Sequence, residues 1–191
     1  MFDLVVRRVA MLAATPVLFV LAAPAVAHGP IVPPRPSLVP PPDAAPRIPA
    51  TVPTPEATSV ARQRAHSMMV QVARLTNQER QAAGCPALST DRELITASLR
   101  QSWYMARTRL FSHVWRDGSD FVSRSRAAGY RQPAGENIAW GYRSATDVVD
   151  AWMKSPGHRA NILNCGAKSI GTGVAYSADG TPYYTQVFGW E

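Results

Sequence analysis

The sequence of 191 residues lacks the motifs that mark the common hydrolases. It contains neither a Gly-x-Ser-x-Gly nucleophile elbow nor a His-Glu-x-x-His zinc helix. It also lacks a basic run interleaved with aromatic residues, so nucleic acid is a poor candidate partner although the formal net charge is +7. The basic residues, nearly all arginine, are scattered, which is typical of a solvated surface. They also fit a partner such as an anionic envelope polymer or a lipid headgroup.

Long apolar runs are absent after residue 27. The one such run, Val9–Val26, follows two arginines and ends in the small-x-small cleavage site Ala25-Val26-Ala27. We therefore expect residues 1–27 to be a signal peptide, and the protein to be secreted, extracellular or held in the cell envelope. The alternative is an uncleaved membrane anchor, because about 18 apolar residues approach the span of a bilayer. Pro16 and Pro24 favour cleavage, after which we expect no transmembrane span.

Cysteine is scarce, with only Cys85 and Cys165 in the chain. Thiols of an exported protein tend to pair, and these two allow one pairing. A Cys85–Cys165 disulfide closing so long a loop would contribute on the order of 4 kcal/mol in the chain-entropy model. The alternatives are a cysteine nucleophile paired with a histidine, and metal ligation by the two thiols.

Large apolar residues are also sparse between residues 28 and 58, where prolines dominate. Proline fixes φ and removes a backbone donor, so this segment cannot build a core and is expected to be an extended linker. The folded domain is then expected to span residues 59–191. No internal repeat of about 20 to 50 residues is visible, which argues against a solenoid.

Periodicity within the domain predicts helices over residues 59–83, 90–109, 119–128 and 144–155. Thr90 and Glu93 have the spacing of a capping box, and Ser119 is the expected cap of the third helix. Strands are expected at 137–140, 170–176 and 183–190, the last two joined by a hairpin turn. These elements indicate an α+β fold in which helices cover both faces of a small, mainly antiparallel sheet.

Histidine is the residue that the candidate site depends on, since only four are present in the chain. His113 and His158 lie on either side of Glu136 in the sequence, and imidazole and carboxylate are the groups that ligate metal or move protons near neutral pH. Gly135 and Gly157 directly precede Glu136 and His158 and permit close backbone approach. The alternative is that Glu136 only stabilises the surroundings through hydrogen bonds while both histidines lie nearby.

Several motifs, taken in order, resemble the CAP superfamily of cysteine-rich secretory, allergen and pathogenesis-related proteins, closest to its exported bacterial branch. The motifs are Leu94-x3-Ser98-x6-Met105-x5-Phe111-Ser112-His113, Gly129-Tyr130, Gly135-Glu136-Asn137-Ile138-Ala139, Trp152-Met153-x-Ser155-Pro156-Gly157-His158-Arg159-x-Asn161-Ile162-Leu163 and Ile170-Gly171-x-Gly173. The resemblance covers about residues 66 to 190. It implies an SCP-like domain, a three-layer α-β-α sandwich with a central groove.

The resemblance also implies a groove tetrad of two histidines and two acids, which some members use to bind zinc or another divalent metal. Carried over by position, His113, Glu136 and His158 are the expected catalytic candidates, and His113 and His158 the possible metal ligands. The fourth position is Ser155 here, whose hydroxyl cannot replace a carboxylate base. Two histidines fall short of the three or four protein ligands of a tight zinc site, so no cofactor is expected to be required.

Two functions from different classes follow from the resemblance. The first is a non-enzymatic module that binds a lipid, a cell-wall polymer or a protein in the groove. The second is a weakly metal-dependent hydrolase, in which His113 and His158 hold the ion and Glu136 is the general base. Of the aromatic residues, we expect Trp140, Trp152 and Tyr184 in the core and Trp115 exposed beside His113.

Overall fold

The structure is a computed structural model that describes residues 55–191, so the expected signal peptide and the linker up to residue 54 lie outside the described residues. The described helices and strands, in chain order, are α1 (Pro55–Ala82), β1 (Ser89–Thr90), α2 (Arg92–Thr108), α3 (Phe121–Ala127), β2 (Pro133–Trp140), α4 (Ala145–Lys154), α5 (Pro156–Ile162), β3 (Ser169–Tyr176) and β4 (Pro182–Gly189). No helix among them combines the length and apolarity needed to cross a bilayer.

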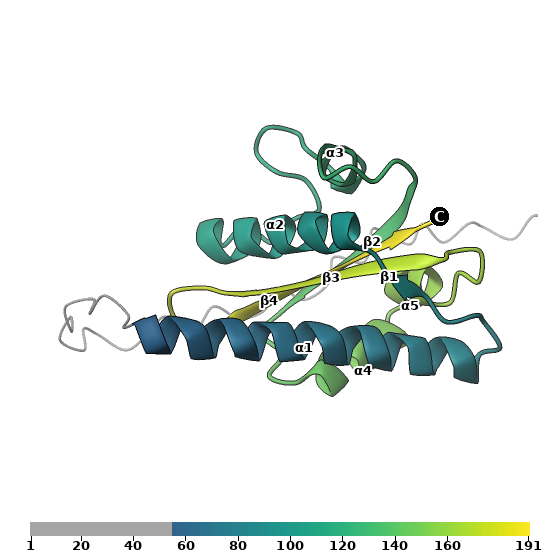
Figure 1. The fold of residues 1–191 in the computed structure, drawn as a ribbon, viewed down its shortest axis with the longest axis horizontal. Helices are drawn as coiled ribbons and strands as arrows, with labels where there is room; N and C mark the ends of the chain where they lie inside the picture. The colour runs from purple at the N-terminus through teal and green to yellow at the C-terminus, as the bar shows by residue number, and fades with distance from the viewer. Residues whose placement is uncertain (1–54) are drawn as a thin grey trace, which may run out of the picture. The chain divides into compact units, whose positions relative to one another are not determined.

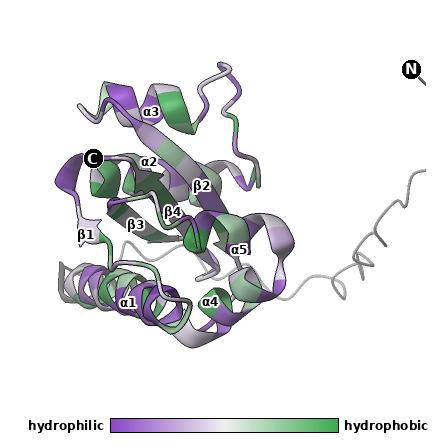
Figure 2. Ribbon diagram, turned by 90° about the vertical axis from the view of Figure 1, so that its right-hand side faces the viewer, coloured by the Kyte–Doolittle hydropathy of each residue, from purple (hydrophilic) through white to green (hydrophobic). Residues whose placement is uncertain are grey.

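The strands form one sheet in the order β1-β3-β4-β2. β1 pairs with β3 in parallel, whereas β2 and β3 both run antiparallel to β4. Helix α2 covers one face of the sheet with α3 beyond it, and α1 and α4 cover the other face (Figures 1 and 2). The expected α+β class, the three layers and the mainly antiparallel sheet are therefore confirmed.

Four local expectations were wrong. Thr90 pairs with Ile170 in β1, so the next residue, Asp91, caps α2 by accepting the Leu94 N–H at 2.8 Å. Asp120, not Ser119, caps α3. The segment Pro156–Ile162 is a helix, α5, whereas the last expected helix ended at residue 155 with none after it. Trp140 is 53% exposed because it ends its strand at the surface.

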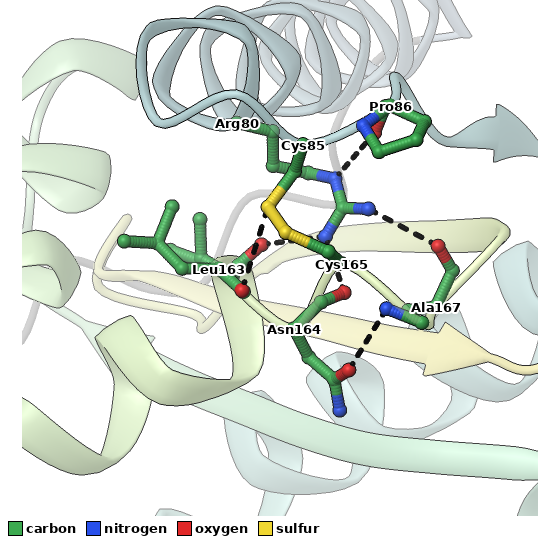
Figure 3. Close-up of a disulfide and its surroundings, with 9 residues drawn as sticks. Arg80, Cys85, Pro86, Leu163, Asn164, Cys165 and Ala167 are labelled. Atoms are coloured by element: carbon green, nitrogen blue, oxygen red, sulfur yellow. Dashed lines mark hydrogen bonds between the residues drawn. A yellow bond between two sulfur atoms is a disulfide. The ribbon is translucent and has the colours of Figure 1, made fainter.

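A buried arginine holds the end of α1 to the rest of the domain. Arg80 is fully buried, and its guanidinium donates to four backbone carbonyls: Pro86 at 2.9 Å, Ile162 at 2.8 Å, Asn164 at 2.7 Å and Ala167 at 3.1 Å (Figure 3). Burial lowers the pKa of the guanidinium from its usual value because the charged form loses hydration. Carbonyl oxygens supply the compensation that water gives an exposed arginine.

The expected disulfide forms beside this arginine. Cys85 and Cys165 are bonded across 80 residues of sequence, and Figure 3 shows the bridge next to the Arg80 carbonyl contacts. Because both sulfur atoms are in this bond, neither serves as a nucleophile or a metal ligand. The disulfide and Arg80 join the same two segments, the end of α1 and the connection from α5 to β3.

Helix α2 lies directly on β3 because the contact is made of very small residues. A Cβ atom added to Gly171 would come within 2.0 Å of the Leu94 backbone, and one added to Gly173 within 2.3 Å of the Ser98 backbone. The hydroxyls of Ser98 and Ser102 donate to the carbonyls of Gly171 and Gly173 at 3.0 and 2.9 Å. The helix-to-strand contact thus combines close approach with satisfied hydrogen bonds.

We predict that Gly171→Ala lowers the free energy of unfolding by about 3 kcal/mol, because the new methyl group forces α2 away from β3. Urea unfolding followed by circular dichroism measures the change. Gly157→Ala is the matched control, since nothing lies within 4 Å of a Cβ atom at that position, and we expect a change within about 0.5 kcal/mol. Equal effects of the two substitutions would contradict this account of the packing.

Candidate functional site

Glu136 lies on β2 with its side chain only 1% exposed, and both carboxylate oxygens are occupied. Arg124 of α3 donates through Nη2 to Oε2 at 2.7 Å, and His113 Nδ1 contacts Oε1 at 2.8 Å. Because a carboxylate only accepts hydrogen bonds, the Nδ1 atom of His113 carries the proton in this contact. The glutamate is therefore a buried anion neutralised by a buried arginine.

Arg124, which the sequence analysis missed, also positions the loop that carries His113. Its Nη1 donates to the carbonyls of His113 at 2.9 Å and Ser119 at 2.7 Å. One signal was available: Arg124 lies three residues after Phe121, on the side of α3 that faces inward. A charge at an inward helical position requires a partner, and Glu136 is that partner.

The expected close approach at Gly135 is present and brings α5 onto β2. A Cβ atom there would lie 2.8 Å from Asn161 Oδ1, so any larger residue would force the Asn161 side chain to shift. Asn161 Nδ2 donates to the Glu136 carbonyl at 3.2 Å and to Asn137 Oδ1 at 2.9 Å. Asn137 Nδ2 in turn donates to the His158 carbonyl at 3.2 Å. The Gly-Glu-Asn segment therefore fixes the helix that carries His158.

His158 is half-buried near the start of α5, with its Nδ1 atom hydrogen-bonded to Ser155 Oγ at 2.8 Å. Burial lowers the pKa of His158 below the usual 6.5, and the charge of His113 lowers the pKa further. The fold therefore brings the two histidines within electrostatic range of each other. Ser155 orients an imidazole ring here and supplies no negative charge.

A groove of about 260 Å³ opens beside His158. It is lined mainly by apolar and aromatic side chains: Phe111, Ile138, Ala139, Trp140, Tyr142, Ala151, Trp152, together with Ser155 and His158. Phe111 and Trp140 are 46% and 53% exposed, whereas Trp152 is buried as expected, and so is Tyr184. Trp115 is half-buried and lies against a different groove, described below.

The donor set does not fit a tight zinc site. Residues 55–191 contain no group of three or more His, Cys, Asp or Glu residues placed to hold a metal ion. The Nδ1 atoms of His113 and His158 are engaged by Glu136 and Ser155. Each ring therefore offers only Nε2, and two imidazoles are fewer than the three or four protein ligands of structural and catalytic zinc.

We predict that Glu136→Gln lowers the free energy of unfolding by about 3–5 kcal/mol, because the substitution leaves the Arg124 charge buried without its counter-ion. Urea unfolding measures the loss. Asp150→Asn removes an exposed carboxylate from α4, and we expect a change within about 0.5 kcal/mol. If the two variants were equally stable, the carboxylate would not have the structural role described here.

We also predict that NMR titration gives His158 a pKa below 6.5, and that the pKa rises in His113→Gln because a neighbouring positive charge is removed. His66→Gln, an exposed change on α1, should leave the pKa of His158 where it was. Since folding lowers this pKa, the unfolded chain takes up the proton first. Protonation of His158 therefore lowers the free energy of unfolding as pH falls below 6.5, and this effect is absent at higher pH. A pKa indifferent to His113 would mean that the rings do not interact.

Comparison with known proteins shows the family of this chain and supports its fold. The family model described as CAP, cysteine-rich secretory protein family, matches residues 73–188. YkwD of Bacillus subtilis strain 168 is 36% identical over 144 residues, which cover 74% of this chain and 54% of YkwD. The membrane protein YlbC of the same strain is 33% identical over 119 residues, 62% of this chain and 33% of YlbC. The chain thus spans about half and a third of these two relatives.

Among solved structures, an extracellular protein from Bacillus anthracis that contains an SCP domain is similar, with a TM-score of 0.64 and 27% sequence identity. That likeness covers 72% of this chain and 44% of the other. An outer surface protein of Borrelia burgdorferi shares the fold, with a TM-score of 0.59 at 20% identity, over 64% of this chain and 92% of that protein. This chain belongs to the cysteine-rich secretory protein (CAP) family.

Proposed function

We propose that the protein is a secreted or cell-envelope module that binds its ligand, without chemical turnover, in the groove beside His158. The observation that carries this proposal is that Glu136 is buried with both carboxylate oxygens engaged. A general base must reach the proton that it abstracts. Both oxygens of Glu136 are held, by Arg124 and His113, and the carboxylate is buried.

The lining of the groove supports a ligand with an apolar portion. Aromatic rings of Phe111, Trp140 and Tyr142 and the aliphatic Ile138 surround the opening, and His158 and Ser155 supply the polar groups. Mostly apolar pockets with a few placed polar groups are typical of small-molecule sites. Of the ligands that an envelope protein meets, lipids match this lining better than polar wall polymers. A protein ligand would match through an apolar side chain.

The proposed location is supported by the apolar run and cleavage site at the N-terminus, by the disulfide, and by the likeness to an extracellular Bacillus anthracis protein. Disulfides persist in oxidising compartments outside the cytosol. The positive net charge of the chain, +7, favours contact with anionic polymers and lipid headgroups of an envelope.

The alternative, a metal-assisted hydrolase, draws support from the two histidines that lie within electrostatic range. It requires Glu136 to leave Arg124 and act on water, and it requires the metal to be held by two imidazoles. Separating Glu136 from Arg124 and holding a metal with only two imidazoles each cost free energy. Ligand binding in the groove involves neither cost. We therefore favour binding, with His158 and Ser155 as polar contacts to the ligand and His113 held by Glu136.

To test the proposal, the purified, disulfide-bonded protein is titrated with a fluorescent fatty acid, and a phospholipid, a sterol and purified peptidoglycan are added as competitors. We expect Trp140→Ala and Phe111→Ala each to weaken binding by about 5–30-fold, because each removes apolar contact worth roughly 1–2 kcal/mol. Trp190→Ala is the matched control, since Trp190 is an exposed tryptophan, 40% accessible, outside the groove lining.

The same titration with zinc present separates the two functions. Binding that is unchanged by zinc and by a chelator, with no turnover of the bound lipid, agrees with the proposal. Binding that requires zinc, or hydrolysis that is lost in both His113→Ala and His158→Ala, would favour the hydrolase. If no competitor displaced the fatty acid and Trp140→Ala left its affinity unchanged, the groove would not be the ligand site.

A further inference from the structure

A second, larger groove lies on the outer face of α2. Its volume is about 600 Å³, and it shares no lining residue with the groove beside His158. Its walls are Leu99, Trp103, Tyr104 and Trp115, and Arg100 and Arg107 line it as well. The volume falls in the range of about 300–1,000 Å³ that is typical of small-molecule sites.

The aromatic walls are held rigidly in place. The rings of Tyr104 and Trp115 stack with their centroids 4.7 Å apart and an interplanar angle of 14°. Trp115 donates its ring N–H to Gln101 Oε1 at 2.5 Å, and the Tyr104 hydroxyl accepts the Arg116 backbone N–H at 2.9 Å. The Trp115 ring N–H and the Tyr104 hydroxyl oxygen are therefore engaged within the protein, and the stacked rings form the apolar wall of the groove.

Trp103 stands out on this face because it is 56% exposed on a well-formed helix. A large exposed aromatic that belongs to a continuous apolar surface is typical of a binding site. Its neighbours Leu99 and Tyr104 continue the same apolar wall. The surface is thus larger than a single stray hydrophobic residue.

The charged residues that line this groove, Arg100 and Arg107, have one sign. The guanidinium of Arg107 lies over the Trp103 ring, 5.0 Å from its centroid, which fixes the cation at the edge of the apolar wall. Within residues 55–191, neither Arg100 nor Arg107 takes part in an ion pair with a carboxylate. Both cations are therefore available to an anion from outside.

We infer that this groove binds an anionic amphiphile, a molecule with one apolar chain and a carboxylate or phosphate headgroup. The chain lies against the apolar walls, and the headgroup pairs with Arg100 and Arg107. A neutral saccharide would leave Arg100 and Arg107 without a counter-charge, and an inorganic anion would leave the apolar walls exposed to water. Because the surface is a groove of molecular size, the occupant is a single molecule and not the face of a bilayer.

The test uses dodecyl phosphate below its critical micelle concentration, followed by isothermal titration calorimetry. All measurements are made in the Trp140→Ala background, so that the groove beside His158 does not contribute. We expect one molecule to bind, and we expect Trp103→Ala and the double variant Arg100→Gln/Arg107→Gln each to weaken binding at least about 10-fold. Arg92→Gln, an exposed arginine of the same helix outside the groove, should leave the affinity unchanged.

Two further ligands complete the design. Dodecyl maltoside, with the same chain and an uncharged headgroup, should bind at least about 10-fold more weakly, since it forms no ion pair. Phosphatidylglycerol vesicles report on the alternative occupant. Binding to vesicles without binding to monomeric dodecyl phosphate would overturn the inference in favour of a membrane-docking face. Equal affinity for the charged and uncharged amphiphiles, or for the parent and the arginine double variant, would overturn it as well.

The outcome is independent of the proposed function. Because a fatty acid is itself an anionic amphiphile, the fatty acid titration is repeated in the Arg100→Gln/Arg107→Gln background. Failure of Trp140→Ala to weaken fatty acid binding in that background concerns only the groove beside His158. The α2 groove is judged by Trp103 and the two arginines. Circular dichroism of each variant confirms that it folds, which we expect because all three side chains are at the surface.

Discussion

The site depends on a single requirement, that a buried guanidinium must have its N–H groups hydrogen-bonded. Arg80 meets this requirement with four carbonyls, two of which belong to Ile162 and Asn164 at the end of α5. Arg124 meets it with two carbonyls and the Glu136 carboxylate. Each arginine therefore fixes one half of the site. Arg80 holds the helix that carries His158, and Arg124 holds the loop that carries His113. Loss of either cation would free one histidine relative to the other, although neither arginine faces the groove beside His158.

The same requirement determines how Glu136 can act. A carboxylate that balances a buried cation stabilises the fold only while it stays ionised and in place. A general base must do the opposite, because it gains a proton and loses its charge during the reaction. The contacts of Glu136 therefore favour a structural anion that holds and polarises His113 through the 2.8 Å hydrogen bond. With both oxygens engaged, Glu136 holds the His113 imidazole in a fixed position but is poorly placed to accept a proton from a ligand.

The fold was predictable from periodicity wherever an element is long. The pattern of Leu94, Ser98 and Met105 predicted α2, and the alternation after residue 170 predicted the β3–β4 hairpin, because both repeat over several turns or residue pairs. Helix α5 has only seven residues and begins with Pro-Gly, and β1 has two, so neither presents a period to detect. The buried arginines were missed for another reason. Pattern analysis assigns charges to the surface, and only a three-dimensional partner reveals an exception. For the same reason, chain spacing could not bring His113, Glu136 and His158 together, and that inference depended on the family resemblance.

Packing on the inner face of α2 explains why the outer face carries aromatic residues. Gly171 and Gly173 bring β3 so close that the helix can present only small side chains such as Ser98 and Ser102 to the strand. A tryptophan on that side would separate the two elements. Trp103 is therefore compatible with α2 only on the outer face, where it is 56% exposed. The domain thus has two grooves with separate origins, one set by buried cations that position imidazoles and one set by a backbone contact that excludes large side chains. Because these constraints share no side chain in the lining of the two grooves, ligand binding at one groove can change without loss of the other.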